Sequence, residues 1–255
     1  MQQTNYMKTT CLFLLPFCFS GALLAQNCNN ASLSGAYAYA ASGNMTVDGK
    51  ISNNSEVGRM VFDGKGGITG YAARTVAGTS NVGTFTGSYA VGADCTTTGR
   101  TTYSDGALDF DMVVVNAGND FVFVLRHPAF TESGSGTKIE AQGKCSAASV
   151  SGAFGYQGDG NITLDGKLQT LVEVGILTFN GTGSVTGTYS AAAGGELERL
   201  TFTGTYELGE DCTGNMKFNI AGGAYVNNFV IASGTNTMLY SEVGPNSVIT
   251  GSGAR

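Results

Sequence analysis

The sequence predicts an all-β protein built from two tandem antiparallel meander domains. Three observations predict this fold class: apolar residues alternate with period two, glycine-rich turns separate the short apolar runs, and the second half of the chain repeats the first. No stretch beyond Ala25 has the periodicity of an amphipathic helix. We expect each domain to be a small eight-stranded barrel, because eight meandering strands can close and remove free edges. A pair of β-sandwiches is the alternative architecture.

Residues 1–25 are predicted to be a signal peptide rather than part of the fold. Lys8 precedes an apolar run over 9–19, and a stretch of small and apolar residues ends at Ala25. This order is typical of a secretory leader, whereas a membrane anchor needs a longer apolar run. We therefore expect a mature chain that begins near Gln26 and is exported to the periplasm, the medium or the cell surface.

The internal repeat predicts two domains of similar size. An offset of 117 in residue number places Cys28–Thr96 on Cys145–Thr213 without a gap, and 31 of these 69 positions are identical. A period of domain length indicates tandem domains rather than a solenoid of short repeats. We place the first β-barrel-like repeat at 26–143 and the second at 144–255.

Beyond this block, the best pairing of the two copies moves to an offset of 108. It aligns Phe110 with Phe218 and Asn119–Val122 with Asn227–Val230. On this alignment, the second copy lacks a segment that the first copy holds at 97–105.

Each copy contains about eight runs with strand-like alternation. Turn sequences such as Asp63-Gly64 and Asn180-Gly181 separate the runs, because these dipeptides tolerate the positive φ of tight hairpins. In the first copy the runs start near Ser34, Ile51, Gly67, Val82, Thr98, Ala107, Asp120 and Thr137. Aromatic residues are expected to fill both interiors, namely Tyr37, Tyr39, Phe62, Phe85, Tyr89, Phe110, Phe121 and Phe123, and Phe154, Tyr156, Phe179, Phe202, Tyr206, Phe218 and Phe229.

The cysteines predict one disulfide bond in each copy. Two of the six cysteines belong to the leader, and the other four recur at the same two positions of each copy. Four cysteines allow three pairings, and the repeat selects Cys28–Cys95 and Cys145–Cys212. Metal binding is the alternative, but there is no C-x-x-C motif and only one histidine, so no metal site and no cofactor is predicted.

Charge and composition exclude some classes of partner. The formal net charge is -6, which is unsuited to a nucleic-acid-binding surface, and no run in the mature chain is long enough for a membrane span. Only 13% of the residues are charged, and the polar faces of the predicted strands carry Thr, Ser and Gly. The partner is unknown at this stage, and a cell-surface polymer or another protein suits such a surface.

The search for catalytic residues assigns none. His127 is the only histidine, and no nucleophile elbow or phosphate-binding loop occurs. The candidate carboxylates are acids that occur in both copies: Glu56 and Glu173, Asp94 and Asp211, Glu132 and Glu242, and Asp48 and Asp165. Glu56 and Glu173 could act as general acids inside a barrel. The favoured interpretation is structural, with Asp48 and Asp165 in Asp-Gly turns and the others capping turns or accepting backbone N–H bonds.

Several runs resemble a group of exported bacterial β-repeat proteins whose activity is uncharacterised. In the first copy they are Ser32–Tyr37, Gly58–Gly70, Phe85–Tyr89, Ala93–Thr96 and Phe121–Val124. The meander is more distantly similar to the barrel of plant allene oxide cyclases and dirigent proteins. That resemblance implies an eight-stranded barrel with an apolar interior. No catalytic motif of those enzymes matches numbered positions here.

Three functions follow as hypotheses. The favoured one is a secreted or cell-surface, non-catalytic pair of β-domains with a structural, adhesive or binding role. The second is a carrier of a small apolar ligand inside the barrels, and the third is an isomerase similar to allene oxide cyclase that uses barrel carboxylates. Because aromatic side chains bury about 150–250 Å² each, we expect packed interiors and binding on the outer surface or between the domains.

Overall fold

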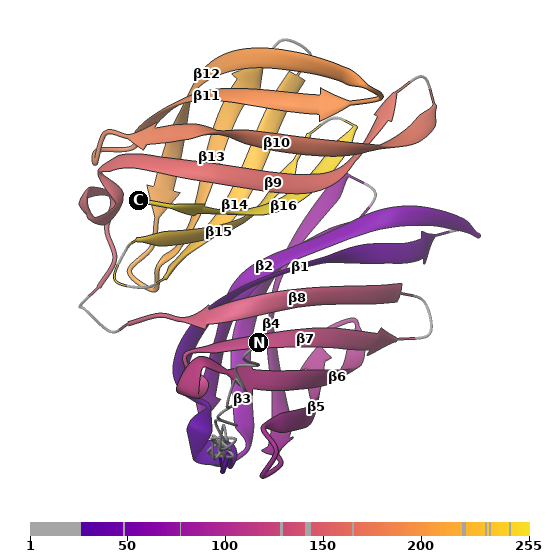
Figure 1. Ribbon diagram of the computed structural model, residues 1–255, viewed down its shortest axis with the longest axis vertical. Coiled ribbons are helices and arrows are strands. Elements are labelled where there is room, and N and C mark those ends of the chain that lie inside the picture. The colour runs from indigo at the N-terminus through magenta and orange to yellow at the C-terminus, as the bar shows by residue number, and fades with distance from the viewer. Residues whose placement is uncertain are drawn as a thin grey trace, which may run out of the picture.

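The structure, a computed structural model, describes residues 27–255 except 48, 77, 128–129, 141–143, 165, 221–222, 233, 235 and 245. These residues form two closed, eight-stranded antiparallel barrels in tandem (Figure 1). The predicted all-β class and the barrel architecture are therefore confirmed. The predicted leader and the predicted turn residues Asp48 and Asp165 lie outside the described residues.

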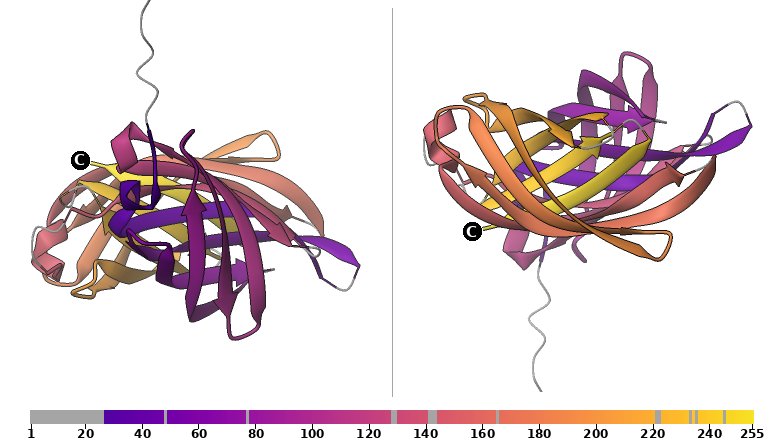
Figure 2. Two further views of the ribbon diagram at one scale, coloured as in Figure 1. Left: turned by 90° about the horizontal axis from the view of Figure 1, so that it is seen from below. Right: turned by 90° about the horizontal axis from the view of Figure 1, so that it is seen from above.

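The first barrel is a simple meander, because each strand pairs with the next and β8 closes on β1. The long β1–β2 hairpin projects to one side of the molecule (Figure 2). The strands are β1 (Ser34–Val47), β2 (Lys50–Asp63), β3 (Gly67–Val76), β4 (Thr79–Val91), β5 (Thr96–Tyr103), β6 (Gly106–Val115), β7 (Asp120–His127) and β8 (Phe130–Lys138).

The second barrel repeats this order, and β16 closes on β9. Its strands are β9 (Gly152–Leu164), β10 (Lys167–Phe179), β11 (Ser184–Ala193), β12 (Glu196–Leu208), β13 (Thr213–Ile220), β14 (Gly223–Ala232), β15 (Thr237–Val243) and β16 (Ser247–Ala254). Short 3-10 turns, η1 (Asn30–Ser32) and η3 (Ala147–Val150), precede β1 and β9, and η2 (Asn116–Gly118) joins β6 to β7.

The expected change of offset from 117 to 108 is wrong. The last three strands of the barrels begin at 106 and 223, at 120 and 237, and at 130 and 247, so the offset stays at 117 to the end of the chain. The false alignment arose because Phe121 and Phe229 both point inward beside outward valines, although they lie on β7 and β14. The second copy therefore lacks no segment of the first.

The eighth strand begins at Phe130 rather than near Thr137 as expected. Its inward positions include Gly134 and Gly136, which carry no apolar signal. A Cβ on Gly136 would lie 2.2 Å from the ring of Phe121, so the missing side chain is what lets that ring sit in the core. The sequence pattern does not reveal this part of the strand, because glycines stand at its inward positions and side chains of neighbouring strands fill the space beside them.

The predicted aromatic residues are all buried and fill both interiors. In the first barrel the ring of Phe62 packs edge-on against Tyr37 and Tyr89, at centroid distances of 5.4 and 5.0 Å. In the second barrel the rings of Phe202 and Phe218 stack at 4.3 Å. Side chains of this size leave little free volume inside an eight-stranded barrel.

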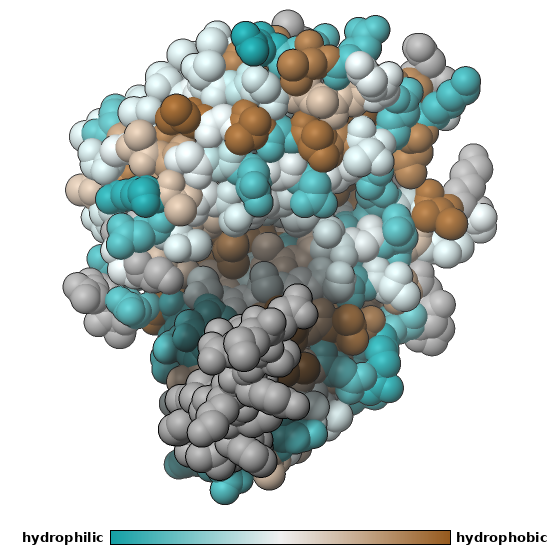
Figure 3. All heavy atoms as spheres, viewed as in Figure 1, coloured by the Kyte–Doolittle hydropathy of each residue, from teal (hydrophilic) through white to brown (hydrophobic). Residues whose placement is uncertain are grey.

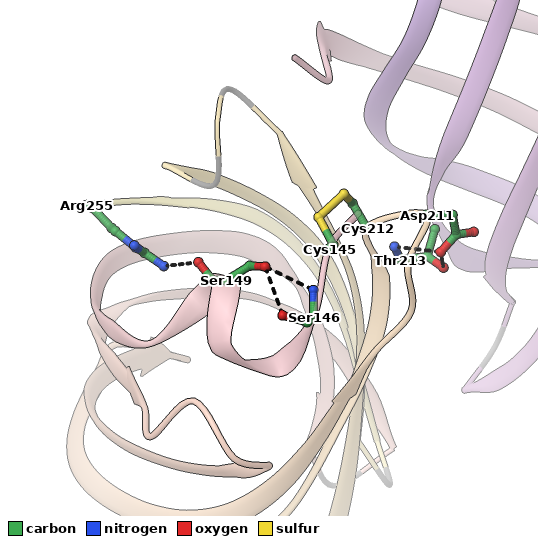
Figure 4. The surroundings of a disulfide bond; sticks show 7 residues. All are labelled: Cys145, Ser146, Ser149, Asp211, Cys212, Thr213 and Arg255. Atoms are coloured by element: carbon green, nitrogen blue, oxygen red, sulfur yellow. Dashed lines mark hydrogen bonds between the residues drawn. A yellow bond between two sulfur atoms is a disulfide. The ribbon is translucent and has the colours of Figure 1, made fainter. Parts of the chain in front are cut away.

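Two disulfide bonds, Cys28–Cys95 and Cys145–Cys212, tie the start of each copy to the turn before its fifth strand. Figure 4 shows the second bond beside η3, where the capping residue Ser146 and Ser149 bond to each other. Both Cys95 and Cys212 have a positive φ. The guanidinium of Arg255 donates to the carbonyl of Ser149, which joins the end of the chain to the same turn.

The two barrels contact each other through the outer faces of different strands. Small residues on β1, β2 and β3 meet β14 and β15, forming a separate apolar cluster of Ala38, Val57, Ala73, Val230, Ala232 and Leu239. Three polar contacts surround it: Ser55 Oγ to Ser241 Oγ at 2.7 Å, Asn161 Nδ2 to Asn53 Oδ1 at 3.0 Å, and Asn228 Nδ2 to Ser80 Oγ at 3.5 Å. We call this contact the closed face.

Candidate functional site

A cleft of about 1320 Å³ separates the barrels on the side away from the closed face. The strands β7 and β8 of the first barrel and β9 and β10 of the second border it on the near side of Figure 1, and Figure 3 shows the hollow between the two bodies. Its first wall carries Val113, Val122 and Val124, and its second wall carries Val172, Val174 and Leu197. These six side chains, which we call the valine walls, are all exposed.

The charged residues that line the cleft are acidic. They are Asp111, Asp159 and Glu173, and Asp111 is paired with Arg126 at 3.0 Å. The remaining lining consists mainly of serine, threonine, glycine and alanine, and its aromatic residue, Phe123, is buried in the first barrel. The cleft is therefore suited to neutral, apolar chemistry and not to an anion.

The first barrel encloses an ion pair between Arg74 and Glu56. The two guanidinium nitrogens Nε and Nη2 of Arg74 lie 2.7 and 2.6 Å from Glu56 Oε2. The hydroxyl of Tyr39 donates to Glu56 Oε1, and that of Tyr103 lies 3.3 Å from the same oxygen. Burial is the largest single effect and lowers the pKa of Arg74, but the charges of Glu56, Tyr103 and Glu132 and the hydrogen bond to Glu56 together raise that pKa overall.

A second carboxyl group, that of Glu132, lies near this pair. Burial, followed by the charge of Glu56, raises the pKa of Glu132 to about 8, and Arg74 opposes that rise. Asn54 on β2 and Glu132 on β8 both pair with Gly43 on β1. Asn54 and Glu132 therefore flank a residue without a side chain, and Asn54 lowers the pKa of Glu132.

The second barrel holds two buried carboxyl groups, Glu173 and Glu242, without an arginine. The position equivalent to Arg74 is Ala191. The hydroxyl of Tyr240 donates to Glu173 Oε1 at 2.8 Å. Burial raises the pKa of Glu173 to about 7, and burial and the charge of Glu173 raise the pKa of Glu242 well above its usual value.

The expected correspondence of Glu132 with Glu242 is wrong in position. At the constant offset of 117, Glu132 matches Ile249 and Glu242 matches Leu125. An asparagine lies beside the acid in both barrels. In the first barrel Asn54 accompanies Glu132, and in the second Asn227 pairs with Glu242 across β14 and β15. The sequence shows this exchange only at the constant offset of 117, because the offset of 108 aligns different strands.

The remaining candidate acids fall into two groups. Asp94 and Asp211 cap turns, because each accepts bonds from the backbone N–H and the hydroxyl two residues on, at Thr96 and Thr213. The expected turn-capping role does not apply to the other group, which is buried inside the barrels on strands and consists of Glu56, Glu173, Glu132 and Glu242.

Access to Glu56 is narrow. The void beside Glu56 in the first barrel measures about 10 Å³, which is room for about one water molecule. His127 stacks on Phe130 at a centroid distance of 4.7 Å. Within the described part of the chain, no cluster of three or more potential ligand side chains could hold a metal ion. No helix there has the length and apolar character needed to cross a membrane.

Comparisons with known proteins give likenesses to solved structures, among them the two described here. No family model matches the chain, and no curated protein matches it. The isotype 1 transferrin binding protein B of serogroup B Neisseria meningitidis has a TM-score of 0.36 at 8% identity, over 88% of this chain and 77% of that one. A putative AttH protein of Nitrosomonas europaea has a TM-score of 0.26 at 9% identity, over 86% and 92%. At such TM-scores, neither likeness carries an argument about function.

Proposed function

We propose that this is an exported, non-catalytic binding protein that takes a neutral apolar ligand in the cleft between its barrels. The observation that carries the proposal is the contrast in free volume. The cleft offers about 1320 Å³, whereas the void inside the first barrel offers about 10 Å³. This contrast favours the cleft over a barrel interior, both for a carrier and for an isomerase that would have to bring substrate to Glu56.

The character of the walls supports an apolar ligand. Exposed valines face the cleft from both barrels, and exposed apolar patches of this kind mark binding sites on soluble proteins. The acidic residues of the lining disfavour an anionic ligand. A peptide that adds a strand is also disfavoured, because both barrels are closed and present no free edge.

Export is supported by the two disulfide bonds, which persist in oxidising compartments. The predicted leader of residues 1–25 supports it from the sequence. We therefore place the proposed binding activity in the periplasm, in the medium or on the cell surface.

Titration with the neutral fluorescent probe N-phenyl-1-naphthylamine tests the proposed function. We expect saturable binding of one probe per chain. Val174→Asp should weaken it at least tenfold, because a charge in the valine wall must be desolvated by the probe. Val82→Asp is the matched control: Val82 is 62% exposed against 59% for Val174, but it lies on β4, away from the cleft lining.

Other outcomes of the titration would reject the proposal. Binding of two probes per chain that is indifferent to Val174→Asp would place the ligands inside the barrels. Absence of saturable binding would reject an apolar ligand altogether.

A further inference from the structure

A twofold rotation that exchanged the two barrels would carry residues of the closed face onto residues of the cleft. In a twofold arrangement of two like bodies, a contact between residue i of one and residue j of the other implies a second contact with the roles reversed. The barrels are like bodies, because their strands correspond at a constant offset of 117. Every contact in the closed face therefore has an equivalent pair of residues elsewhere.

Two of the three polar contacts have equivalent pairs that lie across the cleft, whereas the equivalents of Asn53 and Asn161, Thr170 and Asn44, do not line it. The hydroxyl groups of Ser55 and Ser241 contact each other, and their equivalents are Val172 and Val124. Asn228 and Ser80 contact each other, and their equivalents are Asp111 and Leu197. All four equivalents line the cleft, on opposite walls.

At some positions a residue and its equivalent in the other barrel both line the cleft, and these positions lie next to the axis of that rotation. Ala40 and its equivalent Gln157 both line the cleft, as do Ser42 and Asp159, Ser133 and Thr250, and Ser135 and Ser252. These pairs lie on β1 and β9 and on β8 and β16. The axis thus runs beside these four strands, with the closed face on one side and the open cleft on the other.

The two sides differ in burial although their residues correspond. Val57 in the closed face is 1% exposed, and its equivalent Val174 is 59% exposed. Val230 is 1% exposed, and its equivalent Val113, which lines the cleft, is 41% exposed. The open side carries Val172 and Val124 where the closed side carries Ser55 and Ser241. It also carries Asp111 where the closed side carries Asn228, and Asp111 is paired with Arg126.

We propose that the valine walls are the second half of this interface and that the barrels close on each other within one chain. In the closed state, Val124 on β7 meets Val172 on β10. The walls already face each other across one cleft, and they are joined by one chain. A barrel of a second copy is too large to enter a cleft of about 1320 Å³, so the partner of each wall is the opposite wall.

Because both barrels are convex, closure takes the form of a rocking motion about the strands that flank the axis, and the closed face opens as the cleft closes. The closed face is a small cluster that includes Ala38 and Ala73, so its separation exposes little apolar surface beyond Val57 and Val230. This inference goes beyond the proposed function, since closure is a property of the chain with or without a ligand.

Cysteine pairs test the closure. A disulfide needs Cα atoms within about 7 Å, a distance that two contacting side chains satisfy. In the exported protein the four native cysteines are paired, so V124C/V172C adds one reactive pair across the cleft. We expect mild oxidation to join this pair within the monomer, at least tenfold faster than V82C/V172C, which moves one cysteine outside the cleft. S55C/S241C, placed in the closed face, is the positive control.

Three results would overturn the closure. The first is no V124C/V172C bond while S55C/S241C forms, which would mean that the barrels are held apart. The second is a bond only between chains, which would assign the walls to a second copy. The third is oxidation of V82C/V172C at the same rate as V124C/V172C, which would show that the cross-link does not depend on contact between the two walls. Probe binding is measured on the protein without added cysteines, so failure of the cross-link and failure of the proposed function are separate results.

Discussion

Glu132 pairs with Leu125 across β7 and β8, and the equivalent pair in the second barrel has the acid on the other strand, with Glu242 opposite Ile249. The asparagine partner has moved as well, from Asn54 to Asn227. Each barrel thus has two buried carboxyl groups. The first lies at the same position on the second strand of both barrels, whereas the second lies on the eighth strand of the first barrel and on the seventh strand of the second. Among the residues that the structure describes, a cation accompanies the buried carboxyl groups only in the first barrel, where it is Arg74. The predictions on stability follow from this difference.

Replacing Arg74 with methionine should destabilise the first barrel by about 3–5 kcal/mol at neutral pH, because it leaves the buried carboxyl groups without a cation. Denaturant unfolding at pH 7.5 measures the loss. Arg100→Met removes an exposed ion pair with Asp109 and should cost less than about 1 kcal/mol. Equal losses for the two variants would contradict the assigned role of Arg74.

The second barrel should lose stability as the pH rises. The folded-state pKa values of Glu173 and Glu242 lie above the value of about 4.3 in an unfolded chain. The stabilisation by their neutral forms is therefore complete below that pH, and it is lost as the pH rises through about 7 for Glu173 and higher for Glu242. Thermal unfolding between pH 4 and pH 9 measures the decline.

Glu242→Gln should flatten this pH dependence, because the amide imitates the neutral carboxyl group. At pH 8 the variant should unfold at a higher temperature than the unchanged protein. Glu207→Gln removes an acid at an exposed position of β12 and should leave the decline as it was. A pH profile that Glu242→Gln does not alter would show that another group causes the decline.

Removing either disulfide bond should destabilise its own barrel by about 4 kcal/mol, because each closes a loop of the same length. The test is chemical unfolding of Cys28→Ala/Cys95→Ala and of Cys145→Ala/Cys212→Ala. We expect the two losses to agree within about 1 kcal/mol, because the loop length sets the entropic gain. A much larger loss for one pair would mean that its barrel depends on the bond for more than loop closure.

The first copy, residues 26–143, is predicted to fold alone. Each barrel has its own core and its own closing strand, so the halves share only the closed face. Cooperative unfolding of this fragment and a β-type circular dichroism spectrum would support the prediction. An unfolded fragment would show that burial of Ala38, Val57 and Ala73 against the second barrel is essential.

The fold was predictable because period-two alternation and turn dipeptides act locally. The inward aromatic residues follow from spacing, and both cysteine pairs follow from the repeat. The cleft was not predictable in detail, because its walls are outward valines that a single strand cannot distinguish from ordinary exposed residues. The carboxyl pairs were missed because Glu132 and Glu242 pack against Glu56 and Glu173 only after the barrel closes. Gly136 helped to hide the eighth strand, since the side chains that fill its inner face belong to other strands.

Because the two copies keep a constant spacing, a strand or hairpin of one barrel could replace its equivalent in the other. The hairpin of β7 and β8 and the hairpin of β15 and β16 start at equivalent positions, so one can replace the other without changing the length of the chain. The exchange would carry Glu242 to the position of Leu125 and Ile249 to that of Glu132, beside an Asn54 that no longer faces an acid. A recombination between the halves of such a gene would thus preserve the architecture and redistribute its buried charge in a single step.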